Sequence, residues 1–215
     1  SNGGGIYQAE SCTLSLVNVN IDSNTSGGKG GGLYSGGNFA ALASTFNFNT
    51  AYSGGGISSD NGNSENIVDT LLQCIIQGNI TNSSGAGIHI QDFQSIYVVN
   101  ALITDNVAGT SESSGIAGGG VYAYINVNGE YSDFINCTIA NNNVYGVGQG
   151  GGFYRGSGGF RFSNTIVWHN EAENSENVEG YISEYNNSNI DGNDITLNTD
   201  PLFADMYNGN YRLSN

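Results

Sequence analysis

Short alternations of apolar and polar residues recur along the whole chain, with the period of β-strands rather than of helices. The first group lies in residues 6–7, 12–16 and 19–21, where side chains of the two kinds take turns along the chain. Three similar stretches return in each later unit, and Gly, Asn and Ser separate them. This pattern predicts three short strands per repeat, each with one face turned to a common core.

A glycine cluster followed by an apolar residue marks the start of each unit. Its copies are spaced by 24 to 33 residues, which is the range of solenoid repeats. A turn between two sheets favours glycine, because the backbone there adopts positive φ or approaches its neighbours closely. The copies are Gly3-Gly4-Gly5-Ile6, Gly30-Gly31-Gly32-Leu33, Gly54-Gly55-Gly56-Ile57, Gly85-Ala86-Gly87-Ile88, Gly118-Gly119-Gly120-Val121 and Gly150-Gly151-Gly152-Phe153.

A second signature, an apolar residue with Asn three positions later, alternates strictly with the first. Asparagine suits a corner because it tolerates the left-handed backbone region and can bond to neighbouring backbone groups. We therefore expect the six asparagines to stack in a structural hydrogen-bonded ladder. They are Asn24, Asn49, Asn79, Asn106, Asn142 and Asn170.

A further row stands six residues before each of these asparagines and is also rich in amides. We expect a second internal ladder there. Its members are Asn18, Ala43, Gln73, Asn100, Asn136 and Asn164.

The period and the three strands per unit predict an all-β fold, a single-stranded right-handed parallel β-helix of about six to seven coils. With strands about 4.8 Å apart, such a rod is roughly 30 Å long. Residues 1–215 are expected to form one domain, with an acidic and less regular C-terminal coil at 170–215. Because the chain opens inside a repeat, we interpret it as a fragment of a longer exported chain.

Two cysteines are expected to be buried thiols. Cys74 and Cys137 stand two residues before the inward aliphatic residue, in a row that is expected to include Thr45. They lie two coils apart, about 9 to 10 Å, which is too far for a disulfide. Cys12, on another strand, is interpreted in the same way.

The composition narrows the range of partners. The formal net charge is −15, with four Lys and Arg residues in all. Nucleic acids and anionic membrane surfaces bind basic patches, so neither is expected as a partner. The chain has no run of 18 apolar residues, so this segment is not expected to insert into a membrane. Metal cations, Ca²⁺ above all, are the expected charged partners.

The alternation of the two signatures resembles the repeats of polymorphic outer membrane proteins and related bacterial surface β-helices. Phe46-Asn47-Phe48-Asn49, followed by Gly54-Gly55-Gly56-Ile57, matches that pattern most closely, and other copies replace Phe with Ile or Val. The tail from Asp200 to Ser214 is similar to the ending of many secreted β-helix proteins. The resemblance implies a β-helix in an exported, extracellular or cell-surface protein of bacterial type. It implies no particular activity, because the group is functionally mixed.

Four tyrosines follow the inward residue of the glycine signature and are expected to face outward in one line. An exposed aromatic row could stack against sugar rings, which makes it a candidate glycan contact. The alternative, which we favour, is a cross-strand ladder that stiffens one sheet. His89 occupies the equivalent position in the fourth coil. The tyrosines are Tyr7, Tyr34, Tyr122 and Tyr154.

The acidic C-terminal stretch contains a candidate Ca²⁺ site. Asp191, Asn193 and Asp194 surround a tight turn and offer oxygen ligands. Their spacing departs from that of the known calcium loops, and a solvated acidic loop accounts for them equally well. Ca²⁺ is thus a candidate ligand, and no cofactor is required.

A polysaccharide lyase or glycoside hydrolase is the enzymatic alternative. Elimination needs a base and cations beside the substrate carboxylate, and Arg155 and Arg161 are the two cations close together in sequence. Hydrolysis needs two facing carboxylates, roughly 5 to 10 Å apart. The expected outward positions are mostly Asn, Ser, Thr and Tyr, which favours a protein without a catalytic site.

The sequence therefore favours a non-enzymatic structural or adhesive module, a rigid scaffold that contacts a glycan or a surface protein. The end of a solenoid exposes core and strand edges. We accordingly expect either capping by flanking sequence or end-to-end self-association.

Overall fold

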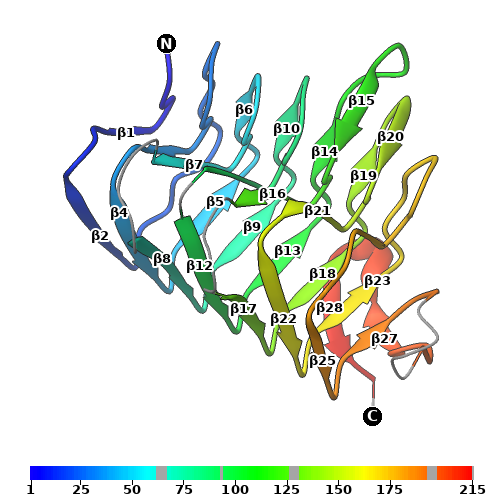
Figure 1. Ribbon diagram of the computed structural model, residues 1–215. Helices are drawn as coiled ribbons and strands as arrows, with labels where there is room; N and C mark the ends of the chain where they lie inside the picture. Colours follow the sequence, from blue (N-terminus) through cyan, green and yellow to red (C-terminus); the bar gives the residue numbers. More distant parts are fainter. Residues whose placement is uncertain (62–66, 93, 126–130, 193–197, 215) are drawn as a thin grey trace.

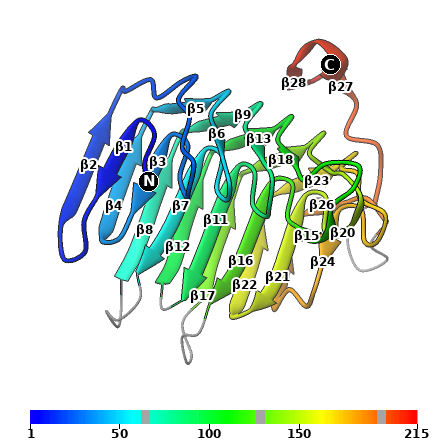
Figure 2. The ribbon, with the colours of Figure 1, turned by 90° about the horizontal axis from the view of Figure 1, so that it is seen from above.

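The computed structural model describes residues 1–61, 67–92, 94–125, 131–192 and 198–214. Its architecture is all-β, a solenoid of about six turns built from parallel sheets, with three main strands in each coil. The predicted fold class is confirmed. Figure 2 shows the coils stacked along one axis, with the C-terminal hairpin standing to one side of the solenoid.

The first six strands of sheet A each begin directly after a glycine signature. Its seven strands pair in parallel, and the apolar residue that ends the signature is stacked in register from coil to coil. The strands are β1 (Ile6–Gln8), β3 (Leu33–Ser35), β7 (Ile57–Asn61), β11 (Ile88–Asp92), β16 (Val121–Ile125), β21 (Phe153–Ser157) and β24 (Val178–Glu179).

Sheet B follows sheet A in every coil and also has seven parallel strands. Its alternate residues, such as Phe39, Leu71 and Val98, are fully buried, while the residues between them face outward. The strands are β2 (Thr13–Val17), β4 (Asn38–Leu42), β8 (Ile67–Leu72), β12 (Gln94–Val99), β17 (Tyr131–Ile135), β22 (Gly159–Ser163) and β25 (Glu184–Asn186).

Sheet C carries the inward residue of the aliphatic-x-x-Asn signature. Its six strands are β5 (Thr45–Asn47), β9 (Ile75–Gln77), β13 (Leu102–Thr104), β18 (Thr138–Ala140), β23 (Ile166–Trp168) and β26 (Asn189–Ile190).

A short sheet D follows the asparagines, and the chain then turns outward before the next glycine signature. Two of these outward turns, in the fourth and fifth coils, are long enough to hold a further pair of parallel strands (Figure 1). Sheet D consists of β6 (Thr50–Ala51), β10 (Ile80–Thr81), β14 (Val107–Ala108) and β19 (Asn143–Val144), and the further pair of β15 (Ser114–Ala117) and β20 (Val147–Gln149).

The first residue of every glycine signature has a left-handed backbone, with φ between 61° and 70°. A side chain is disfavoured in that conformation, which explains why glycine recurs at this corner. These residues are Gly3, Gly30, Gly54, Gly85, Gly118 and Gly150.

The inward residues of sheets A, B and C form one hydrophobic core along the solenoid. In the fifth and sixth coils the core contains a cluster of aromatic rings. Phe153 packs edge-to-face against Phe134, Phe160 and Phe162, with ring centroids 5.1 to 5.4 Å apart. Such pairs stabilise a core beyond the area that they bury.

The second expected amide ladder is wrong. All six residues of that row have left-handed φ, between 48° and 55°, and all are exposed at the corner between sheets B and C. One amide–amide bond joins them, from Asn164 Nδ2 to Asn136 Oδ1 at 3.1 Å. Asparagine occurs here because it accepts this backbone conformation, not because it forms an internal ladder.

Two of the expectations for the cysteines are corrected: the member of their row in the second coil, and the burial of Cys12. Cys74 and Cys137 are buried, and their thiols lie 3.3 to 3.5 Å from backbone carbonyls. Ser44, 1% exposed, takes the equivalent place in the second coil, whereas Thr45 is only half-buried. Cys12 is exposed, because it precedes β2 at a turn.

After the last coil the chain folds back over the outer side of sheet C. It forms β27 (Phe203–Asp205), the 3₁₀ turn η1 (Met206–Asn208) and β28 (Asn210–Leu213), and the two strands pair antiparallel. Tyr211 anchors this hairpin by donating its hydroxyl to Asp105 Oδ1 at 2.9 Å. The hairpin departs from the solenoid repeat.

Candidate functional site

The six signature asparagines form a continuous hydrogen-bonded column inside the solenoid. The carboxamide oxygen of each later asparagine accepts two bonds from the previous one, from its backbone N–H and its Nδ2. Asn106 illustrates the rest of the pattern, since its Nδ2 also donates to the carbonyl of Ile76 in the preceding coil, at 3.0 Å. Each internal asparagine thus joins three successive coils.

The column ends at Asn177, which lies outside the repeated signature. Asn177 Oδ1 accepts from the backbone N–H and Nδ2 of Asn170, at 3.1 and 2.9 Å. From Asn49 to Asn170 the signature asparagines are at most 2% exposed. A fully bonded polar column in a low-dielectric interior fixes the stacking register, because any slip leaves buried amides unpaired.

The aromatic row forms two stacks on the outer face of sheet A. Tyr7 and Tyr34 stack with centroids 5.3 Å apart, while His89, Tyr122 and Tyr154 form the second stack, at 4.9 and 5.3 Å. Since neighbouring rings cover one another's faces, an internal ring such as Tyr122 offers a sugar mainly its edge. This geometry supports the aromatic-ladder interpretation over a row of sugar-stacking platforms.

Ser58 interrupts the aromatic row, and Lys29 reaches across the outer face of sheet A at this position. Lys29 Nζ donates to Asp60 Oδ2 at 2.5 Å and to Gln91 Oε1 at 3.3 Å. Ser58 is fully buried and His89 is 6% exposed. Burial lowers the pKa of His89 to about 4, the charge of Lys29 acts in the same direction, and Asp60 opposes them. His89 is therefore a neutral ring of the ladder at physiological pH.

One carboxyl group lies inside the core, at a position that sequence reasoning missed. Asp69 in β8 is 1% exposed and occupies the inward position between Phe39 and Ile96. Its oxygens accept bonds from the Ser59 hydroxyl and, at 3.0 Å, from the Phe39 backbone N–H. Burial raises the pKa of Asp69 to about 7, and these two bonds oppose the rise. Strand alternation could have revealed it, because Asp69 stands two residues before the inward Leu71.

Asp69 and His89 are expected to give the stability of the protein opposite dependences on pH. Between about pH 4 and 7 the folded state holds a proton on Asp69 that the unfolded state releases, so this group makes stability fall as pH rises. Between about pH 4 and 6.5 the unfolded state protonates His89 and the folded state does not, so this group makes stability rise. The two contributions therefore oppose one another between about pH 4 and 6.5.

Urea titrations across pH 4 to 7.5 separate the two groups. Relative to the unsubstituted protein, Asp69→Asn is expected to make the free energy of unfolding increase with pH. His89→Phe keeps a ring against Tyr122 and is expected to make the free energy of unfolding decrease with pH, again relative to the unsubstituted protein. The double variant is expected to lose both pH-dependent contributions. A difference between Asp69→Asn and the unsubstituted protein that is independent of pH would show that the pKa of Asp69 is not raised.

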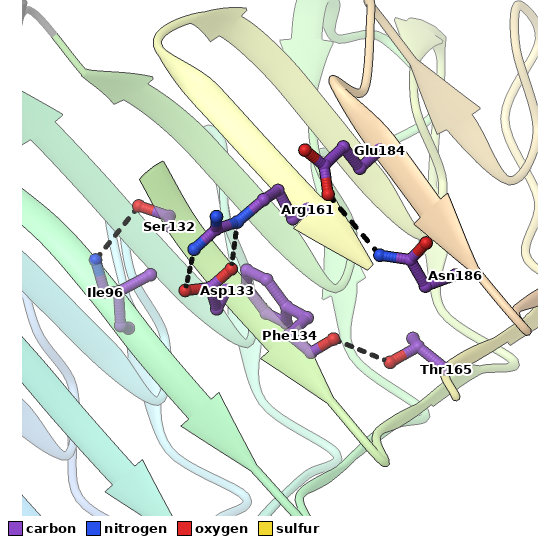
Figure 3. Close-up of polar contacts among 8 residues, drawn as sticks. All are labelled: Ile96, Ser132, Asp133, Phe134, Arg161, Thr165, Glu184 and Asn186. Atoms are coloured by element: carbon purple, nitrogen blue, oxygen red, sulfur yellow. Dashed lines mark hydrogen bonds and ion pairs between the residues drawn. The ribbon is translucent and has the colours of Figure 1, made fainter. Parts of the chain in front are cut away.

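Arg161 belongs to an outward ion-pair cluster on sheet B (Figure 3). Its Nε and Nη2 donate to the two carboxylate oxygens of Asp133, at 2.6 and 2.7 Å, and its guanidinium lies 4.7 Å from the ring centroid of Tyr131. Glu184 is its register partner on β25. The hydrogen bonds that Arg161 donates to Asp133 are the main cause that raises the pKa of Arg161, and the charges of Asp133 and Glu184 act in the same direction.

Arg155 lies on sheet A, where the register between β16 and β21 is shifted by a bulge. Its Nε donates to the carbonyl of Gly158 at 2.6 Å, which closes the turn between β21 and β22. Arg155 and Arg161 are therefore engaged in separate contacts on different sheets.

Of the three residues of the expected Ca²⁺ site, only Asp191 is among the described residues. Asp191 borders a cavity of about 460 Å³ at the C-terminal end of the solenoid, together with Glu173 and Glu176. Asn193 and Asp194 lie outside the described residues. Over the described ranges, no group of three or more His, Cys, Asp or Glu side chains has an arrangement that could hold a metal ion.

In the described part of the chain, no helix has the length and apolar character needed to cross a membrane. Comparison with known proteins adds no family assignment. No family model matches the chain, no curated protein is significantly similar to it, and no solved structure matches it. The resemblance to surface β-helix repeats thus rests on the two signatures themselves.

Proposed function

We propose that the chain is a non-enzymatic structural or adhesive module of a cell-surface protein, in which the solenoid is a rigid scaffold. The observation that carries the proposal is the buried asparagine column, which is continuous from Asn24 to Asn177. Together with the in-register sheets, it links each coil to the next by side-chain as well as backbone bonds. Such linkage suits a protein that holds a shape under load or at a distance.

Two further features support the proposal. The surface is strongly acidic, with a net charge of −15, which favours solubility and discourages non-specific association outside a cell. The rings of the aromatic row on sheet A stack on one another, which supports a role in stiffening the sheet.

The polysaccharide-degrading alternative would use the Arg161 cluster, where Asp133 and Glu184 flank the cation in register. Asp133 engages Arg161 through both carboxylate oxygens, and Tyr131 lies beside the guanidinium. A base or a substrate-neutralising cation would have to leave these contacts first. The cluster therefore supports a structural ion pair better than a catalytic centre.

Assays of polysaccharide cleavage test the proposal. The protein is incubated with polygalacturonate, alginate, xylan and cellulose, with and without Ca²⁺, and new reducing ends and unsaturated products are measured. We expect product release no faster than with the Arg161→Ala variant. Turnover that disappears in Arg161→Ala and persists in Arg212→Ala, an exposed arginine of the hairpin, would contradict the proposal.

A further inference from the structure

A cavity of about 440 Å³, open to solvent, lies between the C-terminal hairpin and the outer side of the solenoid. One wall is formed by the end of β23 and the residue after it, and the other by β27 and η1. The Tyr211–Asp105 bond holds the hairpin in place, and Tyr211 packs edge-to-face on Phe203, with ring centroids 5.5 Å apart. The cavity lies on a different side of the solenoid from the aromatic row of sheet A.

Aromatic side chains face this cavity from both walls. Trp168 and His169 come from the solenoid, and Tyr207 comes from η1. The rings of His169 and Tyr207 meet edge-to-face, 6.1 Å apart. Trp168 is half-buried, while Tyr207 is 80% exposed, so the cavity opens to solvent beside a large aromatic surface. An exposed tyrosine and a half-buried tryptophan at one cavity provide flat apolar faces with polar edges.

Two carboxylates, Asp200 and Asp205, also line the cavity. Asp205 Oδ2 accepts a bond from Asn208 Nδ2 at 2.8 Å, which orients the carboxylate. Carboxylates accept strong hydrogen bonds from hydroxyl groups and repel anions. The lining therefore suits a ligand with many hydroxyl donors and no negative charge.

We propose that this cavity binds a neutral saccharide of one or two sugar units. Aromatic faces contact the apolar C–H face of a pyranose ring, while carboxylates bond its hydroxyl groups, and the cavity offers both. Its volume lies within the range of ordinary small-ligand sites, about 300 to 1,000 Å³. The site is independent of the scaffold function, which would stand if no sugar binds here.

Tryptophan fluorescence reports on this site directly, because Trp168 is the only tryptophan in the chain. The full chain is titrated with glucose, galactose, mannose, N-acetylglucosamine, lactose and maltose, and with galacturonate as the anionic comparison. We expect a saturable change of Trp168 emission with at least one neutral sugar and none with galacturonate.

Matched variants assign the binding to the cavity. Tyr207→Ala and Asp205→Asn, both at exposed positions, are expected to weaken the affinity at least tenfold without changing the thermal unfolding midpoint. Tyr181→Ala, at a tyrosine that is 69% exposed and outside the cavity, is expected to leave the affinity unchanged. The proposal is wrong if no neutral sugar of the panel gives a saturable change. It is equally wrong if Tyr207→Ala binds as well as the unsubstituted protein, or if galacturonate binds more tightly than every neutral sugar.

Discussion

Replacing Asn106 by alanine is expected to lower the free energy of unfolding by about 4 kcal/mol or more. The Asn106 side chain makes four hydrogen bonds inside the solenoid, two as donor and two as acceptor. Its loss leaves the backbone N–H and Nδ2 of Asn79 and the carbonyl of Ile76 each without a bond that they make in the native column. Buried groups without partners cost more than the bonds themselves contribute.

Asn100→Ala is the matched control, because Asn100 lies in the same coil at an exposed corner with φ of 54°. Ala43 occupies the equivalent corner with φ of 48°, so alanine is accepted there. We expect a loss of about 1 kcal/mol or less, measured by urea unfolding under the same conditions. Equal losses for the two substitutions would show that the buried column contributes nothing beyond an ordinary surface asparagine.

Replacing Gly87 by alanine is expected to destabilise the protein by about 3 kcal/mol or more, enough to unfold part of the population at physiological temperature. A Cβ at Gly87 would lie 2.5 Å from the carbonyl oxygen of Gly120 in the next coil and 3.0 Å from Asn106 Nδ2. The Gly120 carbonyl also accepts the Ile88 N–H at 2.9 Å. Room for the methyl group therefore requires the two coils to separate where they are bonded.

Gly27→Ala provides the comparison at a glycine of an outward turn. A Cβ there has no neighbour among the described residues within 4 Å. We expect its unfolding midpoint to match that of the unsubstituted protein or to rise slightly, because alanine restricts the unfolded chain. A Gly87→Ala variant as stable as Gly27→Ala would show that the coils are not packed as closely as the structure has them.

Sequence periodicity predicted most of the solenoid, because stacking in register copies each residue class onto the one above it. The inward aliphatic residues and the asparagine column follow from spacing alone. The second amide row shows the limit of this reasoning. Asparagine can be selected for its backbone conformation or for its side-chain bonds, and composition does not distinguish the two. Whether the corner is buried does distinguish them. That burial depends on the cross-section of the coil, which the spacing of residues does not give.

Features that occur once are the ones that periodicity missed. The hydrogen bond between Tyr211 and Asp105 joins residues 106 positions apart. Because the hairpin that carries Tyr211 does not repeat, the sequence pattern does not indicate that the two residues are in contact. The cavity beside Trp168 depends on that hairpin and was therefore not predicted. Arg161 could have been paired with Asp133 from their equivalent places in consecutive coils, since opposite charges in register attract.

Native-state hydrogen exchange tests the central claim, that one uninterrupted column makes the solenoid a rigid scaffold. The backbone N–H groups of Asn49, Asn79, Asn106 and Asn142 each donate to the next asparagine side chain. We predict that all four exchange only when the whole solenoid unfolds, with exchange free energies equal to one another and to the free energy of unfolding measured in urea. Exchange free energies that differ from coil to coil by several kcal/mol, or that fall well below the global value, would contradict it.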